Sequence, residues 1–325
     1  EIMSFPVTLE DVNEAHERIA KHIHRTPVFT CETIDNIVQR NVFFKAENLQ
    51  KTGSFKPRGA LNSILKLKEE NSNVAGVVTH SSGNHGMAVA WAARKAGIPC
   101  TVVVARGTPE VKIQAIKGYG ADLVICEPSP TSRVETCDLI AKEKGYFIVH
   151  SYDSYNTIAG QGTMAVEFLE EVPELDAILV AISGGGMTAG VAVAAKAIKP
   201  NIKIFAVEAY GKELEPCLKA NTRLWRNPPQ FIDTIAEGIR IQQVGHKTFP
   251  IVCELVEKQV FTVTDDEMVE AMKFTWQRMK LMIEASSAAG VHAVMSEQMR
   301  QLDPSLKNIG VILCGGNVDV NNLPW

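Results

Sequence analysis

Lys56 is the first residue whose surroundings point to covalent chemistry. It lies in the segment Ser54-Phe55-Lys56-Pro57-Arg58-Gly59-Ala60, where small and turn-forming residues precede a helical pattern. A lysine at the start of a helix is usually a solvated side chain. A buried lysine loses its proton more easily and can form a Schiff base with a carbonyl compound. Taken alone, the segment leaves both interpretations open.

A polar turn that could bind a carboxylate follows further along the chain. The segment Thr79-His80-Ser81-Ser82-Gly83-Asn84-His85-Gly86 stands between an apolar run and an alanine-rich helical pattern. Backbone N–H groups at the start of a helix, together with the hydroxyls, favour an anion there. The same residues would also suit an ordinary turn in which Ser or Asn caps the helix.

Three consecutive glycines suggest a site for a phosphate group. They lie in Ser183-Gly184-Gly185-Gly186-Met187, again between an apolar run and a helical pattern. Glycines let the backbone approach a phosphate closely. The spacing of Gly184, Gly186 and Gly190 does not match the dinucleotide fingerprint, and no P-loop motif is present. The segment therefore favours a monophosphate, with a tight turn as the alternative.

A fourth small-residue turn, Cys314-Gly315-Gly316-Asn317, follows an apolar run near the end of the sequence. The usual role of a free cysteine in such a place is that of a small buried side chain. On its own the segment indicates no chemistry.

These segments must be positioned by alternating strands and helices, because the last three each follow a short apolar run. Apolar runs separated by helical patterns predict a parallel sheet that is covered on both faces, an α/β fold. Ligands of such sheets bind at the carboxyl ends of the strands. We expect strands over residues 74–79, 99–104, 123–126, 147–150, 178–182, 202–207 and 309–313. We expect helices over residues 87–96, 109–117, 131–144, 187–198 and 268–279.

The composition excludes several classes of protein. Of the 325 residues, 46% are apolar and 22% are charged, and the net charge is -4. A disordered, collagen-like or disulfide-dense chain would have a different balance. Nothing suggests a nucleic-acid or membrane partner, which would usually require a clustered basic surplus. The seven cysteines form no C-x-x-C pair, so we expect neither disulfides nor a zinc site, and a reducing, cytoplasmic setting.

In this order, the four turns resemble those of the fold-type II pyridoxal-5'-phosphate enzymes, and within these the serine racemase and serine/threonine dehydratase family. The likeness extends from about residue 8 to about residue 319. It is especially close in the segments 50–56, 79–86, 158–163 and 315–319.

The resemblance implies how the cofactor would be held. Lys56 would carry pyridoxal 5'-phosphate through a Schiff base, with Phe55 packed beside the ring. Asn84 would hydrogen-bond the 3-oxygen, and Cys314 would face the pyridine nitrogen. Gly238 would line the ring. The phosphate would be bound by Gly184, Gly185, Gly186 and Met187.

The resemblance also implies a substrate site for a small amino acid, serine or threonine. Its carboxylate would be bound by Ser81, Ser82, Asn84 and His85, and Arg133 matches a gate arginine of the racemases. Lys56 would act as the base on one face of Cα and Ser82 as the acid or base on the other, which permits racemisation. Loss of the β-hydroxyl would give pyruvate and ammonia.

We therefore expect a serine racemase that also eliminates water, with a dedicated L-serine or L-threonine dehydratase as the close alternative. A β-replacement enzyme of the cysteine synthase type would usually have a different lysine motif and a Gly-Asn-Thr-Gly turn in place of Gly83-Asn84-His85-Gly86. A binding protein that has lost its chemistry would not need Lys56.

Two effector sites of the racemases are only partly matched. Glu208 fits the first ligand of a divalent cation, Mg²⁺ or else Ca²⁺ or Mn²⁺. Leu214 stands where the second carboxylate is expected, with Glu213 and Glu215 on either side; Glu213 is our candidate. For ATP, Lys112, Tyr119 and Lys280 match the nucleotide site, whereas Met87 replaces a glutamine.

The resemblance further implies two open, twisted, mostly parallel sheets flanked by helices, and a homodimer. We expect a small domain over residues 74–152, inserted into a large cofactor-binding domain made of residues 1–73 and 153–325.

Overall fold

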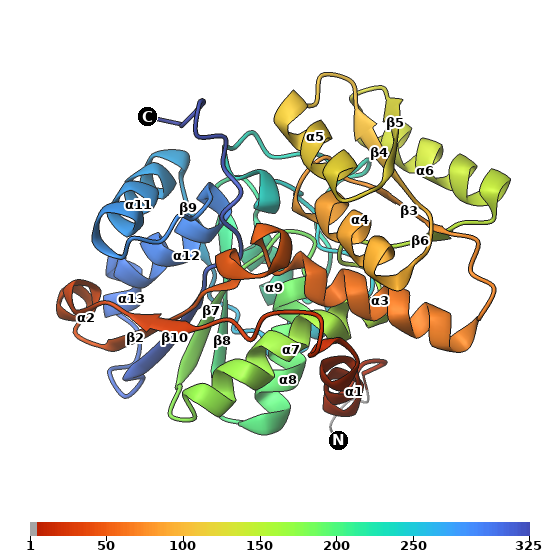
Figure 1. Cartoon of the computed structure of the whole chain (residues 1–325). Helices are drawn as coiled ribbons and strands as arrows, with labels where there is room; N and C mark the ends of the chain where they lie inside the picture. The colour runs from red at the N-terminus through yellow and green to blue at the C-terminus, as the bar shows by residue number, and fades with distance from the viewer. Residues whose placement is uncertain (1–4) are drawn as a thin grey trace.

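Two separate sheets form the framework of the chain. The computed structural model describes residues 5–325. Figure 1 shows the smaller sheet with its helices at the upper right and the larger sheet at the lower left, with α3 running between them. The α/β class and the two mostly parallel sheets expected above are confirmed.

The larger sheet has six strands in the order β1-β2-β10-β7-β8-β9. Only β1 runs antiparallel, against β2; the other neighbours are parallel. β7 and most of β8 and β10 are buried, as their largely apolar sequences require in a sheet covered on both faces. The strands are β1 (Val28–Thr30), β2 (Asn41–Lys45), β7 (Ala177–Ala181), β8 (Lys203–Ala209), β9 (Phe261–Val263) and β10 (Asn308–Ile312).

The smaller sheet has four parallel strands in the order β5-β4-β3-β6. They are β3 (Val77–His80), β4 (Cys100–Ala105), β5 (Asp122–Cys126) and β6 (Phe147–Ile148). The hydrophobic cluster around this sheet also includes Ile19, Ala60, Leu61 and Ile64, so helices from the N-terminal part of the chain help to cover it.

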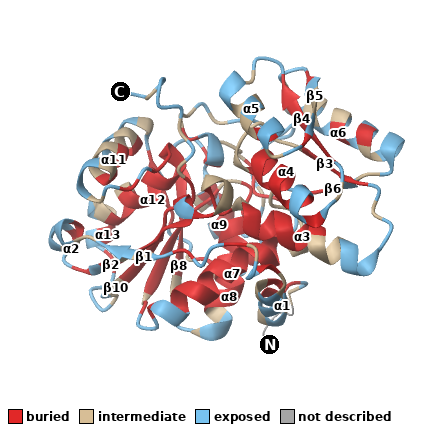
Figure 2. Ribbon diagram, in the orientation of Figure 1, coloured by how far each residue is buried: buried red, intermediate tan, exposed pale blue. Residues whose placement is uncertain are grey.

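Helices cover both sheets. Figure 2 shows that α3, α4, α7, α8 and α12 are mostly buried, whereas α2, α5 and α6 are largely exposed. The α-helices are α1 (Leu9–Ile19), α2 (Glu32–Val38), α3 (Lys56–Glu70), α4 (Asn84–Ala96), α5 (Glu110–Gly118), α6 (Pro130–Lys144), α7 (Tyr155–Glu171), α8 (Gly186–Ile198), α9 (Leu214–Ala220), α10 (Thr248–Leu255), α11 (Asp265–Arg278), α12 (Ala285–Met295) and α13 (Glu297–Arg300). Short 3-10 helices lie at η1 (Glu47–Leu49), η2 (Lys51–Gly53) and η3 (Glu237–Ile239).

The seven strands expected from the apolar runs all exist, with ends that differ by a few residues. The strands β1, β2 and β9 were not expected, and β1 and β9 have only three residues each. Among residues 5–325, no helix has both the length and the apolar composition needed to cross a membrane.

Candidate active site

Lys56 lies at the start of α3, with Pro57 in the first turn of the helix. Its Nζ donates a hydrogen bond to the Ser151 carbonyl (3.0 Å) and lies 4.9 Å from the centre of the Phe55 ring. Burial lowers the pKa of Lys56 to about 8, and the nearby Cys314 and Glu284 act in the opposite direction. A lysine of this pKa is partly neutral near neutral pH and can act as a nucleophile or base.

Cys314 is held beside Lys56 by backbone contacts. The Phe55 N–H donates to the Cys314 carbonyl (3.0 Å), and Ser54 pairs with Gly315 in an isolated bridge. The Cys314 Sγ lies 3.4 Å from the Ser287 hydroxyl. Burial raises the pKa of Cys314 to about 12, so the group is a neutral thiol.

The glycine turn joins β7 to the start of α8. Gly185 has a φ of +94°, a left-handed conformation that disfavours other residues. A Cβ at Gly184 would lie 2.3 Å from the Tyr152 ring, so this position also has no room for a side chain. Gly186 is the first residue of α8 and Met187 is buried beside it. The Thr188 hydroxyl is buried without a hydrogen-bond partner.

These groups fit the expected cofactor. The N–H groups of the first helical turn have no partners within α8, and with the orphaned Thr188 hydroxyl they suit a phosphate. An amine with a lowered pKa and a neutral thiol lie together at the end of β10. Pyridoxal phosphate would supply the aldehyde and the electron-accepting ring that this set of side chains lacks.

The turn between β3 and α4 is tightly folded. A Cβ at Gly86 would lie 2.1 Å from the Ser81 carbonyl, and the Gly83 N–H donates to the Ser81 hydroxyl (3.3 Å). Ser82 is half-buried in this turn. The His85 ring is buried, with Nε2 2.9 Å from the Val149 carbonyl and Nδ1 unpartnered. Burial and the Lys56 charge lower the pKa of His85 to about 3, so the ring is neutral.

Asn84 takes part in a network with Glu284, a residue that no sequence motif singled out. The Asn84 Nδ2 donates to both carboxyl oxygens of Glu284 (3.0 and 3.1 Å), and its Oδ1 accepts from Asn317 (2.8 Å). Burial raises the pKa of Glu284 to about 7. The Gly238 N–H donates to Ser286, two residues beyond Glu284 (3.0 Å). The one feature of the sequence that could have pointed to Glu284 is its position as an acidic residue directly before the apolar helix α12.

Arg133 lies in the first turn of α6, and its Nε is buried without a hydrogen-bond partner. Its guanidinium lies 5.6 Å from the Phe231 ring centre, and that of Arg240 lies 4.6 Å from the same ring. Burial lowers the pKa of Arg133, and so does the charge of Arg240. Two cations on one aromatic ring, one with an orphaned donor, could bind a carboxylate.

The residues expected to bind a divalent cation are not brought together. Glu208 is buried in β8 and accepts hydrogen bonds from the Leu214 N–H and the Thr262 hydroxyl, both 2.9 Å. Glu213 is exposed just before α9. No cluster of three or more His, Cys, Asp or Glu residues suited to a metal exists within residues 5–325. Glu208 and Glu213 therefore do not fit a shared metal ion.

The positions matched to an ATP site also have other contacts. Lys112 pairs with Glu237, and the Lys280 Nζ donates to the Gln277 carbonyl (2.6 Å). Met87 is buried in the hydrophobic cluster of the smaller sheet, and Tyr119 packs against the same cluster. These contacts add no support for ATP at this partly matched site.

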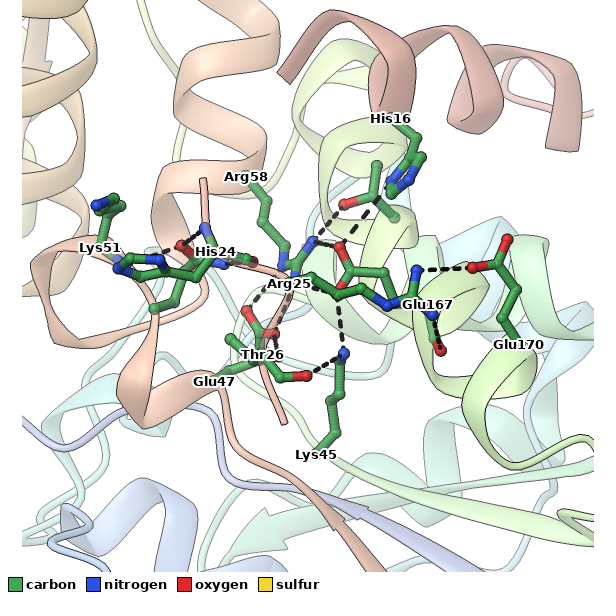
Figure 3. A network of polar contacts seen from close by, with 12 residues as sticks. His16, His24, Arg25, Thr26, Lys45, Glu47, Lys51, Arg58, Glu167 and Glu170 are labelled. Atoms are coloured by element: carbon green, nitrogen blue, oxygen red, sulfur yellow. Dashed lines mark hydrogen bonds and ion pairs between the residues drawn. The ribbon is translucent and has the colours of Figure 1, made fainter. Parts of the chain in front are cut away.

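A buried charge network fixes the first turn of the helix that carries Lys56. Figure 3 shows Arg58 between Glu47 and Glu167, with Lys45 beside them. Arg58 makes two 2.8 Å contacts with each carboxylate and one of 3.0 Å with Thr163, which uses all five of its N–H donors. The Lys45 Nζ lies 2.8 Å from Glu167. The network links β2, η1, α3 and α7.

Several known proteins are similar to this chain over nearly its whole length. The family model described as "Pyridoxal-phosphate dependent enzyme" matches residues 19–315. Serine racemase of Dictyostelium discoideum is 42% identical over 317 residues, which cover 98% of this chain and 97% of that protein. The structure of a pyridoxal 5'-phosphate-dependent aspartate racemase is 55% identical, with a TM-score of 0.98 and 100% of both chains covered. Maize serine racemase is 41% identical, with a TM-score of 0.93 and 98% and 95% covered.

Proposed function

The chain belongs to the pyridoxal-phosphate dependent enzymes, and we propose that it is an amino-acid racemase that interconverts L- and D-serine and also converts serine to pyruvate and ammonia. The family and the cofactor expected from the sequence are confirmed by the match over residues 19–315 and by the serine racemase relatives. The observation that carries the proposal is the Lys56 amine beside the neutral Cys314 thiol, close to the turn that contains Ser82 and His85.

We assign the proton transfers to two side chains. When bound, pyridoxal phosphate makes the Cα–H of an attached amino acid acidic, because its ring delocalises the negative charge. Lys56, whose pKa is about 8, accepts or returns the proton on one face of Cα. The Ser82 hydroxyl does the same on the opposite face. A single base would allow elimination but not inversion, which is what distinguishes the racemase from a dedicated dehydratase.

We assign the substrate carboxylate to the turn before α4. The N–H groups at the start of this 13-residue helix are available to an anion, and Ser81, Asn84 and His85 lie in the same turn. His85 contributes its backbone N–H alone, because its neutral ring donates its single N–H to the Val149 carbonyl. By the family resemblance Cys314 would face the nitrogen of the cofactor ring, where its neutral thiol would be a weak donor, in contrast to the full negative charge of an aspartate.

Aspartate is a second candidate substrate. The aspartate racemase structure is 55% identical to this chain, a higher value than those of the serine racemases described above. The unpartnered Nε of Arg133, next to Arg240, offers a site for a second carboxylate. Racemisation is common to both candidates, so this choice concerns the side chain of the substrate alone.

The two candidates are separated by a product assay. The holoenzyme is incubated with L-serine and, separately, with L-aspartate, and the D-enantiomers are measured by chiral chromatography while pyruvate is measured enzymatically. D-serine with pyruvate supports the serine assignment, and D-aspartate supports the second candidate. Pyruvate from serine without either D-enantiomer would contradict the racemase and favour the dehydratase.

We further propose, from the family resemblance, a homodimer that works in the cytoplasm, with residues 74–152 as a domain inserted between residues 1–73 and 153–325. The smaller sheet lies within the proposed insert, since its strands span residues 77–148. Light scattering of the holoenzyme tests the dimer: a mass of about 71 kDa is expected, twice the 35.5 kDa of the chain.

A further inference from the structure

Lys212 is a buried cation that the proposed reaction does not use. It lies between β8 and α9, and its residue is fully buried. The Nζ donates to three backbone carbonyls, those of Ser183 (2.8 Å), Ile241 (2.6 Å) and Gln242 (2.8 Å). The Trp225 indole donates to the Lys212 carbonyl (2.6 Å), which fixes the backbone at the same point.

The geometry around Nζ defines its charge. A neutral amine has two hydrogens, whereas an ammonium has three and no acceptor. Three carbonyl oxygens within 2.8 Å therefore require the ammonium form. Backbone carbonyls are also among the oxygen ligands of hard cations such as Mg²⁺, Ca²⁺ and Mn²⁺.

The contacts of Lys212 lead directly to the glycine turn. Ser183 is the residue before Gly184, whose carbonyl accepts hydrogen bonds from the Gly245 N–H (3.0 Å) and the Thr248 hydroxyl (2.6 Å). The turn is therefore attached to residues 241–248 at two neighbouring carbonyls. The Ser183 carbonyl is joined to this segment through Lys212, and the Gly184 carbonyl is bonded to it directly. A cation at the position of Nζ keeps these two segments together.

We propose that the ammonium group of Lys212 is a built-in cation that takes the place of a bound divalent metal ion, and that the chain folds and binds its cofactor without such a metal. This agrees with the loop between β8 and α9, where three carbonyls surround the Lys212 amine while Glu213 is exposed and no donor cluster forms in the described part of the chain. The inference concerns folding and metal binding, so it does not depend on which substrate the enzyme uses.

Three variants of the holoenzyme test the proposal. Lys212→Ala opens the space around the three carbonyls, whereas Lys212→Met fills it without a charge. Lys219→Ala is the matched control. It also removes a lysine, from the adjacent helix α9, but the Lys219 side chain is 63% exposed and pairs with Glu215. The thermal midpoint Tm is measured with EDTA and with MnCl2, and Mn²⁺ binding is followed by the electron paramagnetic resonance signal of free Mn²⁺.

We expect EDTA and Mn²⁺ to leave the Tm of the wild type and of Lys219→Ala unchanged, with no stoichiometric Mn²⁺ site. Lys212→Met should lose about 5 °C or more, because the three carbonyls around Nζ are left without a donor, and Mn²⁺ should not restore it. Lys212→Ala should lose a similar amount and regain part of it with Mn²⁺.

Any of three results would overturn the proposal. One is a tight Mn²⁺ site, or a Tm loss with EDTA, in the wild type. Another is a Lys212→Met variant as stable as the wild type. The third is a folded Lys212→Ala variant that Mn²⁺ does not stabilise. If Lys212→Ala does not fold, the wild-type and Lys212→Met measurements still decide the question.

Discussion

Removing Arg58 should destabilise the enzyme more than any exposed ion pair could. The side chain is 0% exposed and uses all five donors, four of them on the carboxylates of Glu47 and Glu167. In Arg58→Met, these two buried carboxylates are left with Lys45 as the remaining buried cation of the network. Breaking a buried pair by removing one partner costs about 3–5 kcal/mol. We expect a loss of that size in the free energy of unfolding.

The loss should be reduced when the stranded charge is removed as well. In the double variant Arg58→Met, Glu47→Gln, the carboxylate left without a cation is neutralised, and Lys45 and Glu167 keep their own pair at 2.8 Å. The two substitutions should therefore be less than additive, with a coupling of about 1–3 kcal/mol. Glu47→Gln is the informative second substitution, because Arg58 is the ion-pair partner of Glu47, whereas Glu167 also has Lys45.

Urea unfolding of the holoenzyme at pH 7 measures both effects. The absorbance of the lysine-bound cofactor provides a second readout, since Arg58 is two residues from Lys56 and a displaced α3 would alter that band. The matched control is Arg106→Met, whose pair with Glu127 is 71% and 65% exposed and is worth at most about 1 kcal/mol. An Arg58→Met variant no less stable than this control, or strictly additive effects in the double variant, would show that the buried charges are not coupled in this way.

Three further predictions concern the active site. Lys56→Ala should abolish racemisation and elimination together, measured as D-serine and pyruvate, while the Tm stays within a few degrees of the wild type; residual turnover of either kind would contradict its role. Ser82→Ala should lose racemisation of L-serine by at least about 100-fold but retain most elimination from L-serine, because only the second face needs Ser82; equal loss of both products would contradict the two-face scheme. Glu284→Gln should remove a pH dependence of stability. The pKa of Glu284 in the folded state, about 7, lies above the 4.5 of the free group, so the native state keeps a proton that the unfolded chain loses. Wild-type stability therefore falls as the pH rises from 4.5 to 7. That loss is up to about 3 kcal/mol, and urea unfolding at pH 5 and pH 8 should show it in the wild type but not in the variant.

The strands and the turns after them could be predicted because their signals are local. The run from Ile178 to Ala181 is apolar throughout, which indicates a strand buried on both faces without any need for a longer-range pattern. The Gly184–Gly186 turn could be predicted for a similar reason, because closely spaced glycines indicate a backbone constraint wherever they occur. The short strand β1 escaped prediction because two of its three residues are exposed and its pairing depends on β2.

The contacts within the site could not be predicted from local signals. Glu284 and Asn84 are 200 residues apart in the chain, and only the packing of the two sheets brings them together. The Arg58 network likewise joins residues from four elements, β2, η1, α3 and α7. At the expected metal site, the residue types suggested the carboxylates of Glu208 and Glu213 as ligands. In the structure the cation at this place is the Lys212 ammonium. Its partners are backbone carbonyls, which every residue has, so residue types alone could not predict the contact.

The proposed function depends on two side chains that exchange the Cα proton from opposite faces. Incubating the holoenzyme with L-serine and, in parallel, L-aspartate in deuterium oxide tests this exchange, with Cα–H loss followed by proton NMR and configuration by chiral chromatography. We expect at least one substrate to yield a D-enantiomer that carries deuterium at Cα, and Lys56→Ala to yield none. Exchange of the Cα proton with complete retention of the L configuration in both substrates would contradict the two-face scheme.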